Sequence, residues 1–116
     1  MLNKLKTIEY NVPCRLNCEY TYTYLQALCP VDGQTDFYTL HISIIPNTKI
    51  FDIYNLKNEL KSFTNVQISQ EDLTYAIFRC IYESVEPEKL QVKVSANIAG
   101  GIHSETIICE DDYHCQ

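Results

Sequence analysis

The fold is decided by a loop that reads Leu28-Cys29-Pro30-Val31-Asp32-Gly33-Gln34-Thr35-Asp36-Phe37 and joins two predicted β-strands. Pro30 lacks a backbone N–H and fixes its own φ, so it ends the incoming strand. Asp32-Gly33 predicts a turn, because glycine adopts positive φ without steric cost. We therefore expect the chain to fold back on itself and to bring Asp36 close to the sulfur of Cys29.

Cys29 and Asp36 allow two interpretations. A thiol beside a group that accepts and returns protons, on a loop between strands, is a candidate nucleophile. A structural cysteine in an ordinary hairpin explains the same residues, and taken alone they favour this second interpretation.

Length and charge limit the class of protein. The chain has 116 residues, of which 46% are hydrophobic, and this fits one domain over residues 1–116. It contains no run of about 18 apolar residues, and residues 1–6 lack the apolar stretch of a signal peptide, so we expect no membrane contact and a cytoplasmic protein. A net charge of -6 disfavours a general nucleic-acid binder, which needs a basic face.

Six cysteines raise the questions of disulfides and metal. They are Cys14, Cys18, Cys29, Cys80, Cys109 and Cys115. A chain with clear helical and strand patterns does not need disulfides, and the spacings of the cysteines and histidines do not match the usual zinc patterns. The sequence therefore predicts no metal site.

Four segments show the two-residue alternation of β-strands. Residues 19–28 alternate tyrosine with threonine, and residues 37–45 place Tyr38, Leu40, Ile42 and Ile44 on one face. Residues 90–98 and 102–109 alternate in the same way on either side of a Gly100-Gly101 turn. We expect the first two strands to pair as an antiparallel hairpin around Cys29.

Two helices are predicted between these hairpins. Asn55 is a candidate N-cap for a helix over residues 56–63. Ser69 and Asp72 resemble a capping box that begins a second helix, which runs to about Val85 before Pro87. Residues 110–116 are expected to form a flexible tail.

The predicted order is strand, strand, helix, helix, strand, strand. This order is typical of an α+β fold in which a four-stranded antiparallel sheet carries two helices on one face. Such a sheet leaves two open edges, which association of several copies would remove.

The order and the loop resemble the tunnelling fold, and within it the 7-cyano-7-deazaguanine reductases and their archaeal relatives, the QueF and QueF-like family. Supporting matches are Ile42-Ser43-Ile44-Ile45-Pro46, Leu56-Lys57, Gln70-Glu71-Asp72 and Gly100-Gly101-Ile102. The resemblance implies that Cys29 adds to the substrate nitrile and that Asp36 handles protons. It implies that Glu71 holds the deazaguanine base; without it, Glu71 is most simply an acidic residue that favours the start of a helix.

The resemblance has further implications for binding and assembly. Gln70, Asn55 and Leu56 become candidate substrate-binding residues. Tunnelling-fold proteins close their sheets side by side into oligomeric barrels with sites between subunits, so the resemblance implies a homo-oligomer.

Three departures from the family pattern occur, and the first two bear on the second reactant. Tyr54 stands in place of a lysine, Ala99 in place of an arginine and Gln70 in place of a histidine. Fewer cations weaken the binding of a dinucleotide phosphate. We therefore expect the QueF-like activity, an amidinotransferase without redox cofactor that uses ammonia to convert the nitrile of 7-cyano-7-deazaguanine (preQ0) in tRNA to the amidine of archaeosine. The alternatives are an NADPH-dependent reductase of free preQ0 and a non-catalytic deazapurine-binding module.

Overall fold

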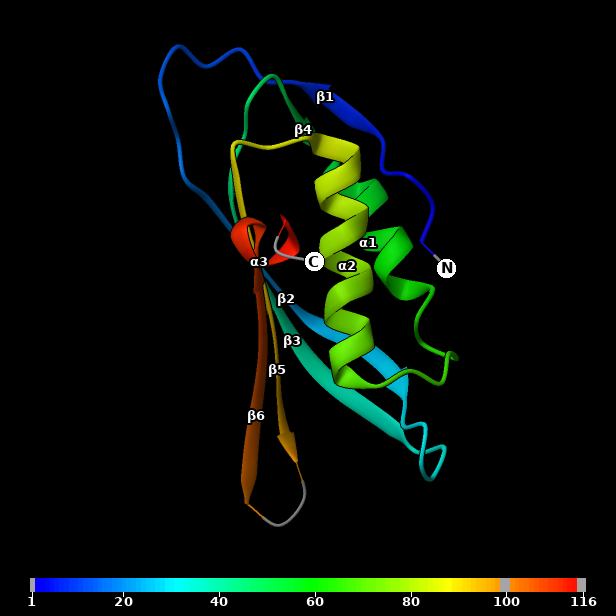
Figure 1. The fold of residues 1–116 in the computed structure, drawn as a ribbon. Coiled ribbons are helices and arrows are strands. Elements are labelled where there is room, and N and C mark those ends of the chain that lie inside the picture. The colour runs from blue at the N-terminus through cyan, green and yellow to red at the C-terminus, as the bar shows by residue number, and fades with distance from the viewer. Residues whose placement is uncertain (1, 99–100, 115–116) are drawn as a thin grey trace.

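A computed structural model describes residues 2–98 and 101–114. Its main sheet is antiparallel with four strands in the order β2-β3-β5-β6. The strands are β2 (Cys18–Leu28), β3 (Thr35–Ile45), β5 (Lys89–Ile98) and β6 (Ile102–Cys109). Helices α1 (Ile53–Lys61) and α2 (Gln70–Val85) cover one face of this sheet (Figure 1). The α+β class and the antiparallel hairpin around Cys29 are confirmed.

Three further elements make the expected order incomplete. Strands β1 (Thr7–Glu9) and β4 (Lys49–Phe51) pair as a small antiparallel sheet, and α3 (Glu110–His114) follows β6. Three-residue strands are too short to show an alternation, so only their pairing defines them. Part of the expected tail is therefore helical, although its mobility stays a prediction.

The core lies between the main sheet and the two helices. The predicted face of β3 is confirmed, because Tyr38, Leu40, Ile42 and Ile44 are all at most 5% exposed. The buried residues that pack with them include Leu90, Val92 and Val94 from β5 and Leu73, Ile77, Phe78 and Ile81 from α2. This alternation fixes which face of β3 looks toward the helices.

Strand β2 departs from the regular alternation predicted for residues 19–28. Tyr22 pairs with Leu40 but Leu25 pairs with Tyr38, so one extra residue is accommodated between these pairs as a β-bulge. Tyr24 is consequently 75% exposed, and Leu25 is 1% exposed. Beyond the bulge, the residues of β2 that face the helices are therefore Leu25 and Ala27.

The helix starts correct one prediction and confirm another. The N-cap of α1 is Asp52, whose Oδ1 accepts bonds from the backbone N–H groups of Tyr54 and Asn55 at 2.9 and 3.1 Å. The prediction of Asn55 as N-cap was wrong, because a carboxylate three residues earlier already satisfies these donors. Ser69 caps α2 as expected, since its Oγ accepts from the N–H of Asp72 at 3.1 Å. The predicted turn at Gly100 falls outside the described residues.

Candidate active site

The loop after β2 is closed by its own backbone. The N–H of Cys29 donates to the carbonyl of Gln34 at 2.7 Å, and the N–H of Gly33 donates to the carbonyl of Cys29 at 2.9 Å. Gly33 has a φ of +74°, which a residue with a Cβ rarely adopts. The predicted turn at Asp32-Gly33 is thus confirmed, and Cys29 is held at the base of a tight loop.

The same loop is tied to the layer of helices. The N–H of Leu28 donates to the carbonyl of Val66 at 2.9 Å, and the N–H of Ile68 donates to the carbonyl of Leu28 at 3.1 Å. These bonds form a parallel bridge between Leu28 and Gln67, in the connection that leads into α2. The residue after Leu28 therefore lies beside the segment that starts α2, whose first turn carries Glu71.

Cys29 is half-buried and its sulfur has polar neighbours. The backbone N–H of Val31 donates to Cys29 Sγ at 3.4 Å. Asp32 Oδ1 accepts from the N–H of Gln34 at 2.9 Å. This bond, followed by a hydrogen bond with the side chain of Cys29, lowers the pKa of Asp32 below its usual value. Sequence reasoning used Asp32 only as a turn residue and missed this second carboxylate beside the thiol.

Asp36 lies on the face of β3 that looks toward the helices. It pairs with Ala27 and is half-buried, and Tyr38 follows it on the same face. The Tyr38 hydroxyl donates to Asp36 Oδ2 at 3.4 Å. Burial, and then the negative charges of Asp36, Cys29 and Glu71, raise the pKa of Tyr38 to about 12. The pKa of the Tyr38 hydroxyl is thus raised by all three residues to which the resemblance assigns a role in the reaction.

Sequence reasoning placed Tyr38 on the buried face and gave it no part in the site. The signal was nevertheless in the sequence, because residues two apart on a strand share a face. A tyrosine two residues after a candidate catalytic carboxylate can reach that carboxylate along the sheet.

The remaining predicted residues lie elsewhere within this chain. Gln70 is 8% exposed, and its Nε2 donates to the carbonyls of Val94 at 2.9 Å and Ser104 at 3.3 Å, so it joins α2 to β5 and β6. Asn55 Oδ1 accepts from the N–H of Lys6 at 2.8 Å, and Leu56 is 8% exposed. Both belong to the first turn of α1, at the opposite end of that helix from the connection that contacts Leu28 (Figure 1).

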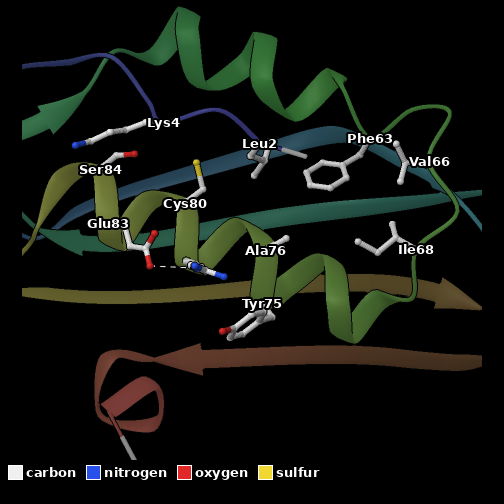
Figure 2. Close-up of a pocket in the computed structure, with 11 residues that line it drawn as sticks. Leu2, Lys4, Phe63, Val66, Ile68, Tyr75, Ala76, Cys80, Glu83 and Ser84 are labelled. Carbon is white, nitrogen blue, oxygen red and sulfur yellow. Dashed lines mark hydrogen bonds and ion pairs between the residues drawn. The ribbon is translucent and has the colours of Figure 1, made fainter. Parts of the chain in front are cut away.

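A cavity of about 470 Å³ is lined by the N-terminal residues, the α1–α2 connection and α2 (Figure 2). Leu2, Phe63, Val66, Ile68 and Ala76 give it an apolar lining, and Arg79 and Glu83 of α2 form an ion pair at its wall. None of Cys29, Asp36, Tyr38 and Glu71 lines it. The volume of this cavity is therefore no reason to place the reaction in it.

The described cysteines are free thiols, namely Cys14, Cys18, Cys29, Cys80 and Cys109. In residues 2–98 and 101–114, no group of three or more His, Cys, Asp and Glu side chains is placed to hold a metal ion. Across this same described part of the chain, no helix has the length and apolar character needed to cross a membrane.

The fold and this cluster define an α+β protein with a thiol and three carboxylates where a strand loop meets the start of a helix. Residues 35–114 match the family described as QueF-like protein, a span that includes Asp36 and Glu71. The chain belongs to the QueF-like family.

Curated relatives agree with this family. The NADPH-dependent 7-cyano-7-deazaguanine reductase of a Nitratiruptor species is 30% identical over 83% of this chain and 72% of its own length. The Aquifex aeolicus enzyme of the same name is 32% identical over 81% and 73%. The Staphylococcus aureus enzyme is 37% identical over 86% of this chain, but this chain spans only 57% of it.

A solved structure shares the fold. The apo form of the archaeosine synthase QueF-Like superimposes with a TM-score of 0.73 over 85% of this chain and 95% of that chain, at 18% sequence identity. At this identity the likeness establishes the fold.

Proposed function

We propose that this protein is an amidinotransferase that converts the nitrile of preQ0 in tRNA to the amidine of archaeosine. The observation that carries the proposal is that Leu28 ties the Cys29 loop to the segment that starts α2, whose first turn carries Glu71, while Asp36 lies on the helix-facing side of β3. A nucleophile, a proton carrier and an anchor for the base are the three groups that the reaction requires.

The first step is the addition of Cys29 to the nitrile carbon. A C–S bond forms, one π-bond of the nitrile breaks, and the thiol proton passes through Asp36 to the nitrile nitrogen, which leaves a covalent thioimide. Ammonia then attacks the same carbon and forms a C–N bond. The C–S bond breaks, Cys29 regains a proton, and the product is an amidine. No electrons are gained or lost, so this route needs no redox cofactor.

Glu71 is the proposed anchor of the base. It is exposed at the first turn of α2, where the unpaired N–H groups of the helix favour an anion. A carboxylate accepts two hydrogen bonds from the N–H and amino edge of a guanine-like base. In this proposal the ring binds at the α2 start and its nitrile points toward Cys29.

Asn55, Leu56 and Gln70 complete the proposal as substrate-binding residues. Asn55 and Leu56 lie in the first turn of α1, at the opposite end of this helix from the connection that contacts Leu28. We propose that they serve the site of a neighbouring copy in a homo-oligomeric barrel. Gln70 acts by fixing the start of α2 through its bonds to β5 and β6.

A second candidate function is the NADPH-dependent reduction of free preQ0. The relatives that are 30–37% identical carry this name, which is the observation in its favour. The thioimide would be shared; bound NADPH would supply a hydride in each of two successive rounds, and with two protons and release of the Cys29 thiol the product would be an amine. Tyr54, 78% exposed on α1, stands where the resemblance implies a lysine for the cofactor, so the site lacks one cation for its phosphates.

A two-stage experiment tests both candidates. The protein is mixed with preQ0 base or preQ0-containing tRNA, and intact-mass and peptide analysis seek an adduct on Cys29. Ammonium or NADPH is then added, and the modified base is identified. An amidine formed with ammonium supports the proposal, whereas an amine formed with NADPH replaces it with the reductase. Bound ligand without an adduct at Cys29 refutes both enzymes and favours a binding module.

A further inference from the structure

The Tyr38 hydroxyl donates to Asp36 and is affected by the charges of Cys29 and Glu71, while its ring packs in the core. The β2 bulge sets this position, because it makes Leu25 the partner of Tyr38 and Ala27 the partner of Asp36. Ala27 is 0% exposed and has a minimal side chain. Its small size leaves the helix-facing side of this strand pair open for the Asp36 carboxylate and the Tyr38 ring.

The hydrogen bond between these two residues has a fixed direction. An ionised carboxylate only accepts, so the Tyr38 O–H donates to Asp36 Oδ2. The ring is 5% exposed and packs in the core, so its hydroxyl has few other positions available. With its pKa raised to about 12, the hydroxyl keeps its proton across the pH range in which enzymes work.

We infer that Tyr38 is a positioning residue for Asp36: its hydroxyl holds the carboxylate at the loop and offsets part of its negative charge beside the thiol of Cys29. A bare carboxylate near a sulfur disfavours the thiolate, and a donor on that carboxylate weakens this effect. The inference rests on the proposed function, in which Asp36 relays the thiol proton. As a positioning residue, Tyr38 does not contact the substrate and acts only through Asp36.

The test compares Tyr38→Phe, Asp36→Asn, the double variant and Tyr24→Phe, a control on the exposed bulge. Single-turnover formation of the Cys29 adduct is followed at increasing preQ0 concentration. We expect Tyr38→Phe to lower the maximal rate about tenfold and to leave the half-saturating concentration unchanged. In the Asp36→Asn background the same change should have no further effect on the rate, while Tyr24→Phe should match the unmodified protein.

A second measurement separates this inference from the proposed function. Iodoacetamide alkylates thiolates without any nitrile chemistry, and peptide mass spectrometry reports its rate at Cys29 alone. We expect Tyr38→Phe to slow this alkylation about threefold, and only when Asp36 is present. Failure of the unmodified protein to form an adduct overturns the proposed function, and the alkylation series still tests Tyr38. Rates unchanged in Tyr38→Phe, or effects that add in the double variant, overturn the role of Tyr38.

Discussion

The two hairpins of the main sheet differ in one instructive respect. Strands β5 and β6 pair residue for residue from Gln91 with Cys109 to Ile98 with Ile102. Strands β2 and β3 are interrupted by a bulge, and Leu28 at the end of β2 bonds to the connection before α2. Cys29 and Cys109 are both half-buried and both lie near carboxylates, but only Cys29 lies in a loop that is tied to the connection before α2, whereas Cys109 ends β6 directly before the acidic α3.

The surroundings of Cys109 differ from those of Cys29. Cys109 Sγ contacts Gln91 Oε1 at 3.5 Å, and burial, followed by the acidic residues of α3, raises the pKa of its thiol. Within the described part of the chain, no backbone N–H is aimed at this sulfur as that of Val31 is aimed at Cys29. Burial and the α3 carboxylates thus favour the neutral thiol of Cys109, whereas the loop around Cys29 supplies a backbone donor to its sulfur.

The largest expected effect comes from removing each of these sulfurs in turn. We expect Cys29→Ser to lower turnover of preQ0 substrate by roughly a thousandfold or more, because a hydroxyl is a far weaker nucleophile. Cys109→Ser should stay within about twofold of the unmodified protein. Steady-state rates and adduct mass measure both, and equal losses in the two variants would show that thiol chemistry is not confined to the β2–β3 loop.

A smaller effect is expected from changing Glu71, the carboxylate in the first turn of α2. Glu71→Gln should weaken preQ0 binding about 10- to 100-fold, since it replaces charged hydrogen bonds with neutral ones. Isothermal titration in a Cys29→Ala background measures binding without reaction. Asp72→Asn is the matched control, because it removes a negative charge from the same helix turn and should leave affinity unchanged. A similar loss in both would assign the effect to the helix start rather than to contact with the base.

The turns of the two hairpins give the next comparison. Gly33 and Gly101 have φ values of +74° and +86°, and an added Cβ would meet no backbone atom within 4 Å at either. Each change to alanine should therefore lower the free energy of unfolding by a similar amount, about 1–2 kcal/mol. Only Gly33→Ala should also slow alkylation of Cys29, because only that turn carries the thiol. Denaturant unfolding and peptide-resolved alkylation check the two parts, and equal alkylation rates would contradict the second.

The smallest effect is a dependence of stability on alkaline pH. The pKa of Tyr38 is raised to about 12 in the folded chain, whereas a tyrosine in the unfolded chain titrates near 10. The unfolded chain therefore releases this proton first, and the stabilising contribution is present below pH 10 and is lost as pH rises to about 12. Partial solvent screening limits the loss to about 1 kcal/mol. Unfolding midpoints should fall less over this range in Tyr38→Phe than in the unmodified protein, and parallel curves would contradict the shift.

Much of this architecture could be predicted from local pattern. The four long strands, the Ser69 cap and the turn at Gly33 follow from alternation, capping chemistry and backbone freedom, and each was confirmed. The closeness of Cys29 to the start of α2 needed the bonds of Leu28, which no spacing along the chain reveals. That contact is long-range, and it depends on how the sheet and the helices pack.

The parts that could not be predicted share a physical cause. Asp52 and Asn55 are both good helix caps by type, and only the geometry of the α1 start decides between them. The β2 bulge has no residue signature of its own in a run of tyrosine and threonine. The closeness of Tyr38 to Asp36 follows from their spacing on β3, but the small Ala27 opposite Asp36 became clear only with the strand register.

The additional residue in β2 shifts the alternation of the strand by one position. Before the bulge, the even-numbered residues of β2 face the helices; after the bulge, the odd-numbered residues face them. Removing one residue between Tyr22 and Leu25 would restore an uninterrupted ladder in which Leu25 and Ala27 still face the helices. The bulge thus lets β2 hold one residue more than the facing stretch of β3 without turning the end of β2 that leads to Cys29 away from α2.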